Sequence, residues 1–165
     1  MLLTKKVAHR ENKYAHNNII NEKYKTTNMV YSLFLAKNAK HVYGFEVIRS
    51  SLENAEKNAM INNINNVHFL KANLDTFFKS GQLPRKVPKP DVIIVDPPRA
   101  GMHPDMSGYL HKLKAKKIIY VSCNPTTQAR DTQILSDSGY KINNSTMVDM
   151  FPHTPHIETV MLLSK

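Results

Sequence analysis

Three short polar segments contain the residues of this sequence whose chemistry is most informative. They are residues 96–99 (Asp-Pro-Pro-Arg), 122–125 (Ser-Cys-Asn-Pro) and 153–158 (His-Thr-Pro-His-Ile-Glu). The first two each follow an apolar, β-branched run that is typical of a buried strand in a parallel sheet. Ligands of open α/β sheets bind beyond the carboxyl ends of such strands. We therefore expect both turns at one binding site, with chemistry that suits covalent catalysis on a nucleobase.

Cys123 is the only cysteine of the chain and could act as a nucleophile. Uracil C5 is a poor nucleophile, so an enzyme that alkylates it needs a covalent bond at C6, which a thiolate can supply. A helix that begins with Asn124 as its N-cap would favour the thiolate form of a cysteine just before it. The alternative is a small buried hydrophobic residue, which is the more common role of a lone cysteine.

The turn at residues 96–99 resembles the (Asp/Asn)-Pro-Pro-aromatic turn of amino-methyltransferases, with Arg99 in place of the aromatic residue. An aromatic ring would stack on a flipped base, whereas the forked cation of arginine suits phosphate or carboxylate. An ordinary proline-rich turn after a strand is the alternative interpretation.

Glu158 lies in a segment that leads into a predicted terminal strand and could act as a general base. A base that removes a proton from C5 must be a carboxylate or an imidazole close to the substrate. His153 and His156 could serve as the base instead, or could orient other groups. A solvated surface glutamate is the alternative without function.

Alternating strands and helices predict an α/β fold with a mainly parallel sheet. Residues 1–28 lack sustained periodicity and are predicted as loop, short helix or disorder. Ser50 and Glu53 form a capping-box pattern at the start of the second helix. The other predicted elements are strands at 41–45, 67–70, 91–95, 117–121, 140–148 and 157–163, helices at 29–38, 104–113 and 125–136, and a helical turn at 76–79.

Composition limits the class of protein and of partner. The 165 residues fit one domain, and 23 basic against 13 acidic residues give a formal charge of +10, which favours a polyanion such as RNA. A solvated basic arm is the alternative for the first 40 residues. One cysteine and scattered histidines predict no disulfide and no metal site, and therefore a reducing, cytoplasmic location. No apolar run reaches the length of a membrane span, so we expect no membrane partner.

Taken together, these segments resemble the RNA uracil-C5-methyltransferases, S-adenosylmethionine-dependent enzymes that make 5-methyluridine in ribosomal or transfer RNA. The resemblance covers about residues 33–165 and is strongest to the ribosomal-RNA branch. It implies a Rossmann-like class I methyltransferase sheet, mainly parallel with an antiparallel C-terminal strand. The segments that carry it are residues 96–101, 120–125, 129–131, 149–154 and 156–158.

The same resemblance implies a role for each candidate residue. Cys123 would add to C6 and Glu158 would take the C5 proton. Independently of the resemblance, an acid at the end of the second family strand commonly accepts the ribose hydroxyls of a nucleoside. The implied roles are catalytic for Cys123 (nucleophile) and Glu158 (general base), cofactor-binding for Glu46, Asn73 and Asp96, and substrate-binding for Arg99 and Asn124.

The sequence departs from the family at its start. Members carry a strand and a glycine-rich loop before the helix that here contains residues 33–36, because the backbone there must approach the cofactor closely. The first glycine of this chain is Gly44. We therefore expect a basic N-terminal segment at 1–32 and a truncated catalytic domain at 33–165, with its first strand missing or replaced. Alternatives are a non-catalytic RNA-binding remnant and an adenine or guanine amino-methyltransferase.

Overall fold

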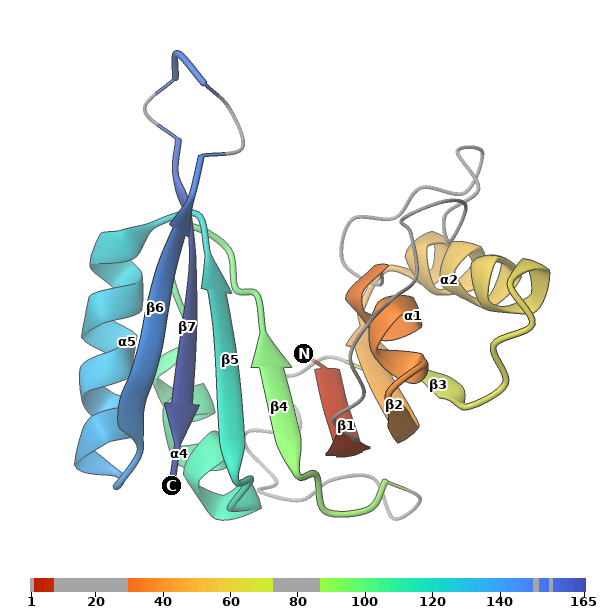
Figure 1. Ribbon diagram of the computed structural model, residues 1–165, viewed down its shortest axis with the longest axis horizontal. Helices are drawn as coiled ribbons and strands as arrows, with labels where there is room; N and C mark the ends of the chain where they lie inside the picture. Colours follow the sequence, from red (N-terminus) through yellow and green to blue (C-terminus); the bar gives the residue numbers. More distant parts are fainter. Residues whose placement is uncertain (1, 8–29, 73–86, 150–151, 155) are drawn as a thin grey trace.

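The computed structural model describes residues 2–7, 30–72, 87–149, 152–154 and 156–165. These residues form a seven-stranded sheet in the order β3-β2-β1-β4-β5-β7-β6, with helices packed on it (Figure 1). The strands are β1 (Leu2–Val7), β2 (Ala39–Glu46), β3 (Val67–Lys71), β4 (Val92–Val95), β5 (Lys117–Ser122), β6 (Lys141–Val148) and β7 (Glu158–Ser164). The helices are α1 (Val30–Ala36), α2 (Arg49–Ile61), α4 (Pro104–Leu113) and α5 (Pro125–Asp137).

Five strands of this sheet run in one direction. β2 pairs with β3 and β4 with β5 in parallel, whereas β1 runs antiparallel to both of its neighbours and β7 antiparallel to β5 and β6. The predicted α/β sheet, mainly parallel with an antiparallel C-terminal strand, is confirmed. The carboxyl ends of β2, β3, β4 and β5 share one edge of the sheet, which we call the carboxyl edge.

Strand β1 corrects the prediction for the N-terminal segment. Residues 2–7 were expected to be loop, short helix or disorder, but they occupy the centre of the sheet between β2 and β4. Without them, β2 and β4 would each present a row of unpaired backbone groups inside the sheet, which is costly. The position between β2 and β4 is thus occupied by an antiparallel strand. Such non-local pairing leaves no periodic signal in a short segment.

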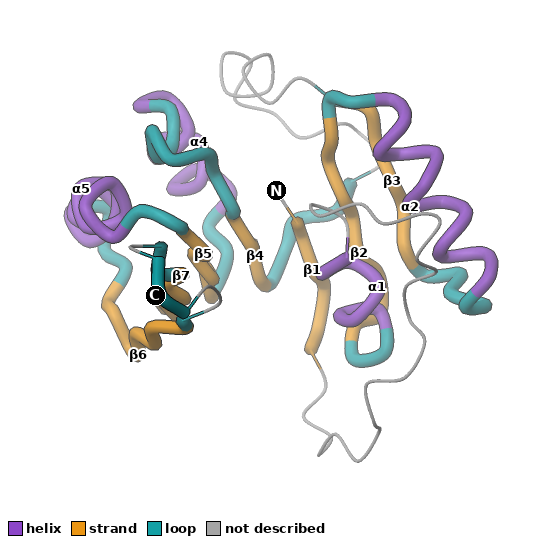
Figure 2. The backbone as a smooth tube through the Cα atoms, turned by 90° about the horizontal axis from the view of Figure 1, so that it is seen from above, coloured by secondary structure: helices purple, strands orange, loops and turns teal. Residues whose placement is uncertain are grey.

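The core has two parts, one on each face of the sheet. Ile93 and Val95 pack in a cluster with residues of α4 and α5, whereas Val92 and Ile94 pack with α1. Successive side chains of a strand point to opposite faces, so α4 and α5 cover one face and α1 the other. Figure 2 shows this arrangement from above. All four residues of β4 are buried, which explains why this strand is a continuous apolar run.

The starts of α4 and α5 agree with the sequence prediction. α4 begins at Pro104 after the N-cap His103, whose ring accepts a hydrogen bond from a backbone N–H. α5 begins at Pro125 after the N-cap Asn124, and Gly139 follows its end with a φ of 91°. Proline fits the first helical position because its missing N–H would be unsatisfied there.

The start of α2 differs from the prediction. The capping box is wrong, because Ser50 lies inside the helix and the N-cap is Ile48, which makes no side-chain cap bond. Instead, Oε1 of Glu46 accepts hydrogen bonds from the N–H groups of Val47 (2.7 Å) and Ile48 (3.0 Å). A carboxylate at the end of β2 therefore organises the turn, and the helix starts before the serine.

Two further predictions, the helical turn at 76–79 and the role of Asn73, lie outside the described residues. Within the described part of the chain, no helix combines the length and apolar character that a bilayer span requires.

Candidate active site at the carboxyl edge

The pairing of β5 with β7 brings Cys123 next to Glu158. The last pair of this antiparallel ladder joins Ser122 to Thr159, so continuing the register by one residue sets Cys123 opposite Glu158. Side chains of directly opposed residues have Cβ atoms roughly 5 Å apart. Both residues are half-buried. The candidate nucleophile and the candidate base thus each lie one residue beyond the last pair of this ladder, at the same end of the sheet.

A buried polar cluster holds the start of β7 against the end of β5. Nε2 of Gln128, from α5, donates to the carbonyl of Tyr120 (2.9 Å). The Thr159 hydroxyl lies 2.7 Å from Oε1 of Gln128 and 3.1 Å from the carbonyl of Ser122. Buried polar groups are costly to leave unpaired. This cluster therefore fixes the position of Glu158 relative to Cys123, and the sequence analysis did not identify it.

Asn124 links the turn after β5 to the turn after β4. Its Oδ1 accepts from the N–H of Thr126 (3.1 Å), which caps α5, and its Nδ2 donates to the carbonyl of Arg99 (3.0 Å). The Thr127 hydroxyl donates to the same carbonyl (3.2 Å). The Asn124 amide thus caps α5 with its oxygen and joins the two turns with its nitrogen. Its role in substrate binding stays a prediction.

Asp131 of α5 fixes the loop between β4 and α4. Oδ2 of this buried carboxylate accepts from the backbone N–H of Met102 (2.6 Å) and from the hydroxyl of Tyr120 (2.7 Å). Oδ1 accepts from Nε of Arg130 (2.8 Å). Burial, followed by the bond to Asp131, raises the pKa of Tyr120, so its hydroxyl remains a donor. The sequence showed Asp131 only as part of a motif.

Glycine is required at position 101 of the same loop. Gly101 has a φ of 84°, and an added Cβ would lie 2.6 Å from Oδ2 of Asp131. The left-handed backbone and the close carboxylate both exclude a side chain. The turn after β4 can therefore approach α5 only with glycine there.

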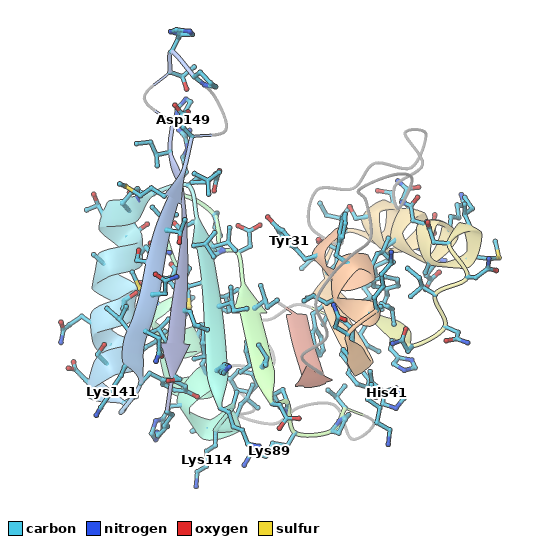
Figure 3. The ribbon with its side chains drawn as sticks, viewed as in Figure 1. Tyr31, His41, Lys89, Lys114, Lys141 and Asp149 are labelled. Carbon is cyan, nitrogen blue, oxygen red and sulfur yellow. The ribbon has the colours of Figure 1, made fainter. Side chains whose placement is uncertain are left out.

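Two acids and a tyrosine form one electrostatic neighbourhood at the carboxyl edge. The pKa of Asp96 is raised by partial desolvation and by the nearby charge of Glu158. Burial, Asp96 and Glu158 all raise the pKa of Tyr31. Figure 3 shows Tyr31 at this end of the sheet, between α1 and β4. Tyr31 is exposed enough to meet a ligand, and no sequence motif pointed to it.

Arg99 contacts the segment before β7. Its Nη2 lies 2.9 Å from Nδ1 of His156. Arginine only donates, so Nδ1 of His156 accepts and carries no proton. A role for His156 as the base would require this contact to break at Nδ1, whereas Glu158 needs no such change. His153, the other alternative, is exposed and has a φ of 71°.

Glu46 and Asp96 flank β1 at the carboxyl edge and fit the ribose part of a nucleoside cofactor. Two backbone N–H groups hold Oε1 of Glu46, which orients this carboxylate at the end of β2. An acid in this place suits the two hydroxyls of a ribose. The stretch before Gly44 contains no glycine, so close approach of backbone to cofactor is not provided there.

Comparison with known proteins decides the family. The sequence model of the tRNA (uracil-5-)-methyltransferases matches residues 14–165. The chain belongs to this family. Its members are S-adenosylmethionine-dependent RNA methyltransferases, which confirms the predicted family, enzyme class and cofactor at that level.

Individual relatives agree with this assignment. An uncharacterized RNA methyltransferase of Oceanobacillus iheyensis is 46% identical over 140 residues, which are 81% of this chain and 28% of that protein. The solved Pyrococcus abyssi tRNA (uracil-54, C5)-methyltransferase in complex with S-adenosyl-L-homocysteine is 38% identical with a TM-score of 0.69. The match covers 83% of this chain and 32% of that one. Magnesium protoporphyrin IX methyltransferase from Synechocystis, with bound S-adenosylmethionine, is 18% identical with a TM-score of 0.59 over 82% of this chain and 65% of its own, and shares only the fold. This chain therefore spans less than a third of the lengths of these RNA methyltransferases.

Proposed function

We propose that this chain carries the catalytic part of an RNA (uracil-C5)-methyltransferase, which transfers a methyl group from S-adenosylmethionine to C5 of a uridine. The observation that supports this best is the register of β5 and β7, because its last pair joins Ser122 to Thr159, the chain neighbours of Cys123 and Glu158. A thiolate and a carboxylate on one side of a ring are the two groups that the reaction needs.

The reaction begins with Cys123. Its thiolate adds to C6, a C6–S bond forms, and the π electrons of the C5=C6 bond move onto C5 and the adjacent carbonyl oxygen. Bound S-adenosylmethionine would supply the methyl group that C5 then accepts, with S-adenosylhomocysteine as the leaving group. The ring now carries both a methyl group and a proton on C5. Glu158 takes that proton, the C–H electrons restore the double bond, and the thiolate leaves.

Asp96 and Tyr31 adapt the surroundings of Glu158 to this role. Two neighbouring carboxyls resist being ionised together, and both burial and the charge of Glu158 raise the pKa of Asp96. Tyr31, with its raised pKa, stays protonated and can donate a hydrogen bond.

The test is covalent trapping. RNA that contains 5-fluorouridine cannot lose a C5 proton, so with S-adenosylmethionine it should form a complex with the chain that survives denaturing electrophoresis. Cys123→Ser should form none, and Met147→Ala, at an exposed site on β6, should behave as the parent does. Absence of a complex while S-adenosylhomocysteine still binds would refute the proposal.

The base has a separate test. Glu158→Gln should accumulate the adduct on ordinary uridine RNA, because the thiolate cannot leave until the C5 proton is removed. His156→Gln should not accumulate it. The reverse result would assign the base to His156.

The RNA class is also part of the proposal. Because of the resemblance of its motifs, we propose ribosomal RNA, specifically 23S, rather than transfer RNA as the substrate. The matching family model and the Pyrococcus relative are named for transfer RNA. Trapping with 5-fluorouridine transcripts of both kinds distinguishes them. A cytoplasmic location belongs to the same proposal.

A second candidate function is a non-catalytic RNA-binding remnant. The lack of glycine before Gly44 favours it, because a chain that cannot bind the cofactor cannot methylate. Titration calorimetry with S-adenosylhomocysteine separates the two candidates, and micromolar binding contradicts the remnant. Methylation of adenine or guanine that persists in Cys123→Ser would instead indicate an amino-methyltransferase.

A further inference from the structure

Lysines gather at the edge of the sheet opposite the carboxyl edge. Figure 3 shows Lys89, Lys114 and Lys141 along this side, away from Tyr31 and Asp149. Other lysines lie on the same side, because β5 and β6 begin there and β7 ends there. All are exposed. We call this group the lysine edge, and it comprises Lys89, Lys114, Lys116, Lys117, Lys141 and Lys165.

The pairing of the strands makes this group contiguous. Lys117 and Lys141 both pair with Ser164 of β7, so they flank one residue, with their backbones roughly 10 Å apart. The N–H of Lys165 donates to the carbonyl of Lys116 (3.1 Å). Four lysines thus start from three adjacent strand ends, where their charges add.

Ion pairing and helix capping do not account for this concentration. Among the six lysines, contact with a described carboxylate is made by Lys116, 3.5 Å from Asp91 and 81% exposed, a pair that contributes little in water. Lys114 caps the C-terminus of α4, and Nζ of Lys165 donates to the carbonyl of Ser138 at the C-terminus of α5 (2.7 Å); a cation is favourable at both places. Lys117 and Lys141 begin strands and gain nothing from a helix dipole.

The two edges of the sheet differ in charge. The carboxyl edge carries three acids, Glu46, Asp96 and Glu158 of the proposed catalytic pair, which repel phosphate, and Arg99 as a cation on the same side. The lysine edge carries cations that attract it. A polyanionic substrate that brings one base to this edge can gain further affinity from phosphate contacts elsewhere on the molecule.

We propose that the lysine edge is a second RNA-contact surface, which binds the phosphates of a structured RNA whose target uridine occupies the carboxyl edge. The proposal rests on the proposed function and extends it to the kind of RNA. The six residues of β5 separate the two edges by roughly 20 Å. A short oligonucleotide in the pocket cannot span both, whereas a folded RNA can.

The test compares two charge-matched double variants. Lys117→Gln/Lys141→Gln changes the lysine edge, and Lys37→Gln/Lys57→Gln removes the same charge from the other half of the molecule, where both lysines are exposed. Each protein is titrated with a long folded RNA at several salt concentrations. Binding should lose about one unit of salt slope for each phosphate contact removed, or about two for the first double variant.

A second readout separates this proposal from the catalytic one. Trapping of a short oligonucleotide with central 5-fluorouridine should be the same in both double variants. Two outcomes would overturn the proposal for the lysine edge. One is an equal loss of long-RNA binding in the two double variants, and the other is a loss in the lysine-edge variant that is as large for the short oligonucleotide as for the long RNA. If the parent traps neither RNA, the proposed function fails, and the salt slopes for the long RNA still decide the lysine edge.

Discussion

Replacing Tyr120 by phenylalanine tests the buried connection between the two catalytic turns. The Tyr120 hydroxyl is fully buried and donates to Oδ2 of Asp131 at 2.7 Å. A hydrogen bond to a charged acceptor contributes about 1.5–3 kcal/mol. Asp131 keeps the N–H of Met102 and its contact with Arg130 in the variant, so it is not left unpaired. We therefore expect Tyr120→Phe to lower the free energy of unfolding by about 2 kcal/mol.

Tyr140→Phe is the matched control. Tyr140 is equally buried, and its hydroxyl donates at 2.8 Å to a neutral acceptor, the carbonyl of Ala115. A bond between neutral groups contributes about 1 kcal/mol. Urea denaturation followed by circular dichroism measures both variants. The ratio of the two losses, rather than either value alone, reports the charge on Asp131.

Two outcomes would refute this reasoning. An equal or smaller loss in Tyr120→Phe than in Tyr140→Phe would show that Asp131 does not act as a charged acceptor. A double-mutant cycle with Asp131→Asn that gives no coupling with Tyr120→Phe would show the same. If both outcomes were observed, a charged Asp131 would not explain the position of the loop after β4.

Three further substitutions test other parts of the site. Gly101→Ala should lower the free energy of unfolding by about 2–4 kcal/mol, because of backbone strain and overlap with a buried carboxylate. Gly139→Ala is the control and should lower it by about 1 kcal/mol, because an added Cβ there would lie 3.4 Å from its nearest neighbour atom. Similar losses for the two variants in urea denaturation would contradict the overlap at position 101. Asn124→Ala should lower it by about 1 kcal/mol through the lost cap of α5, and unchanged thermal unfolding would contradict this. Because the folded pKa of Asp96 is raised above the ordinary 3.8 by desolvation and Glu158, its stabilising contribution is complete below the unfolded pKa and is lost as pH rises through the folded one. Asp96→Asn should therefore gain thermal stability relative to the parent as pH rises through that range, and a constant difference would sink the idea.

Local patterns in the sequence predicted the parts of the fold that local interactions determine. The apolar run of β4 and the Asn124-Pro125 start of α5 each carry their own signal, because burial on both faces and helix capping select residue types within a few positions. Strand β1 has no such signal, since it is defined by two partners distant in sequence, Gly44 and Ile94. The capping box at Ser50 failed because a carboxylate from the preceding strand already satisfied the turn.

The candidate site shows the same division. Cys123 and Glu158 could be named from their motifs, but their adjacency depends on the register of β7, which the sequence does not specify without the turn geometry. Tyr31 comes from a helix on the other side of β1 and joins the site only through the fold. The Tyr120–Asp131 contact joins a strand to the next helix. In the sequence, Tyr120 could be an ordinary core residue and Asp131 an ordinary surface residue, so neither residue type indicates a buried network.

The two tasks of the proposed enzyme depend on different parts of the sheet. The turns that carry Cys123 and Glu158 are held by α5, β5 and β7 through contacts that do not involve β1. Glu46, which we propose on the cofactor side, ends β2, the neighbour of β1. A change in β1 would therefore affect the proposed cofactor side while the contacts between α5, β5 and β7 remain. Weak cofactor binding and an intact pyrimidine-reactive pair are compatible in this chain, because separate hydrogen-bond networks support them.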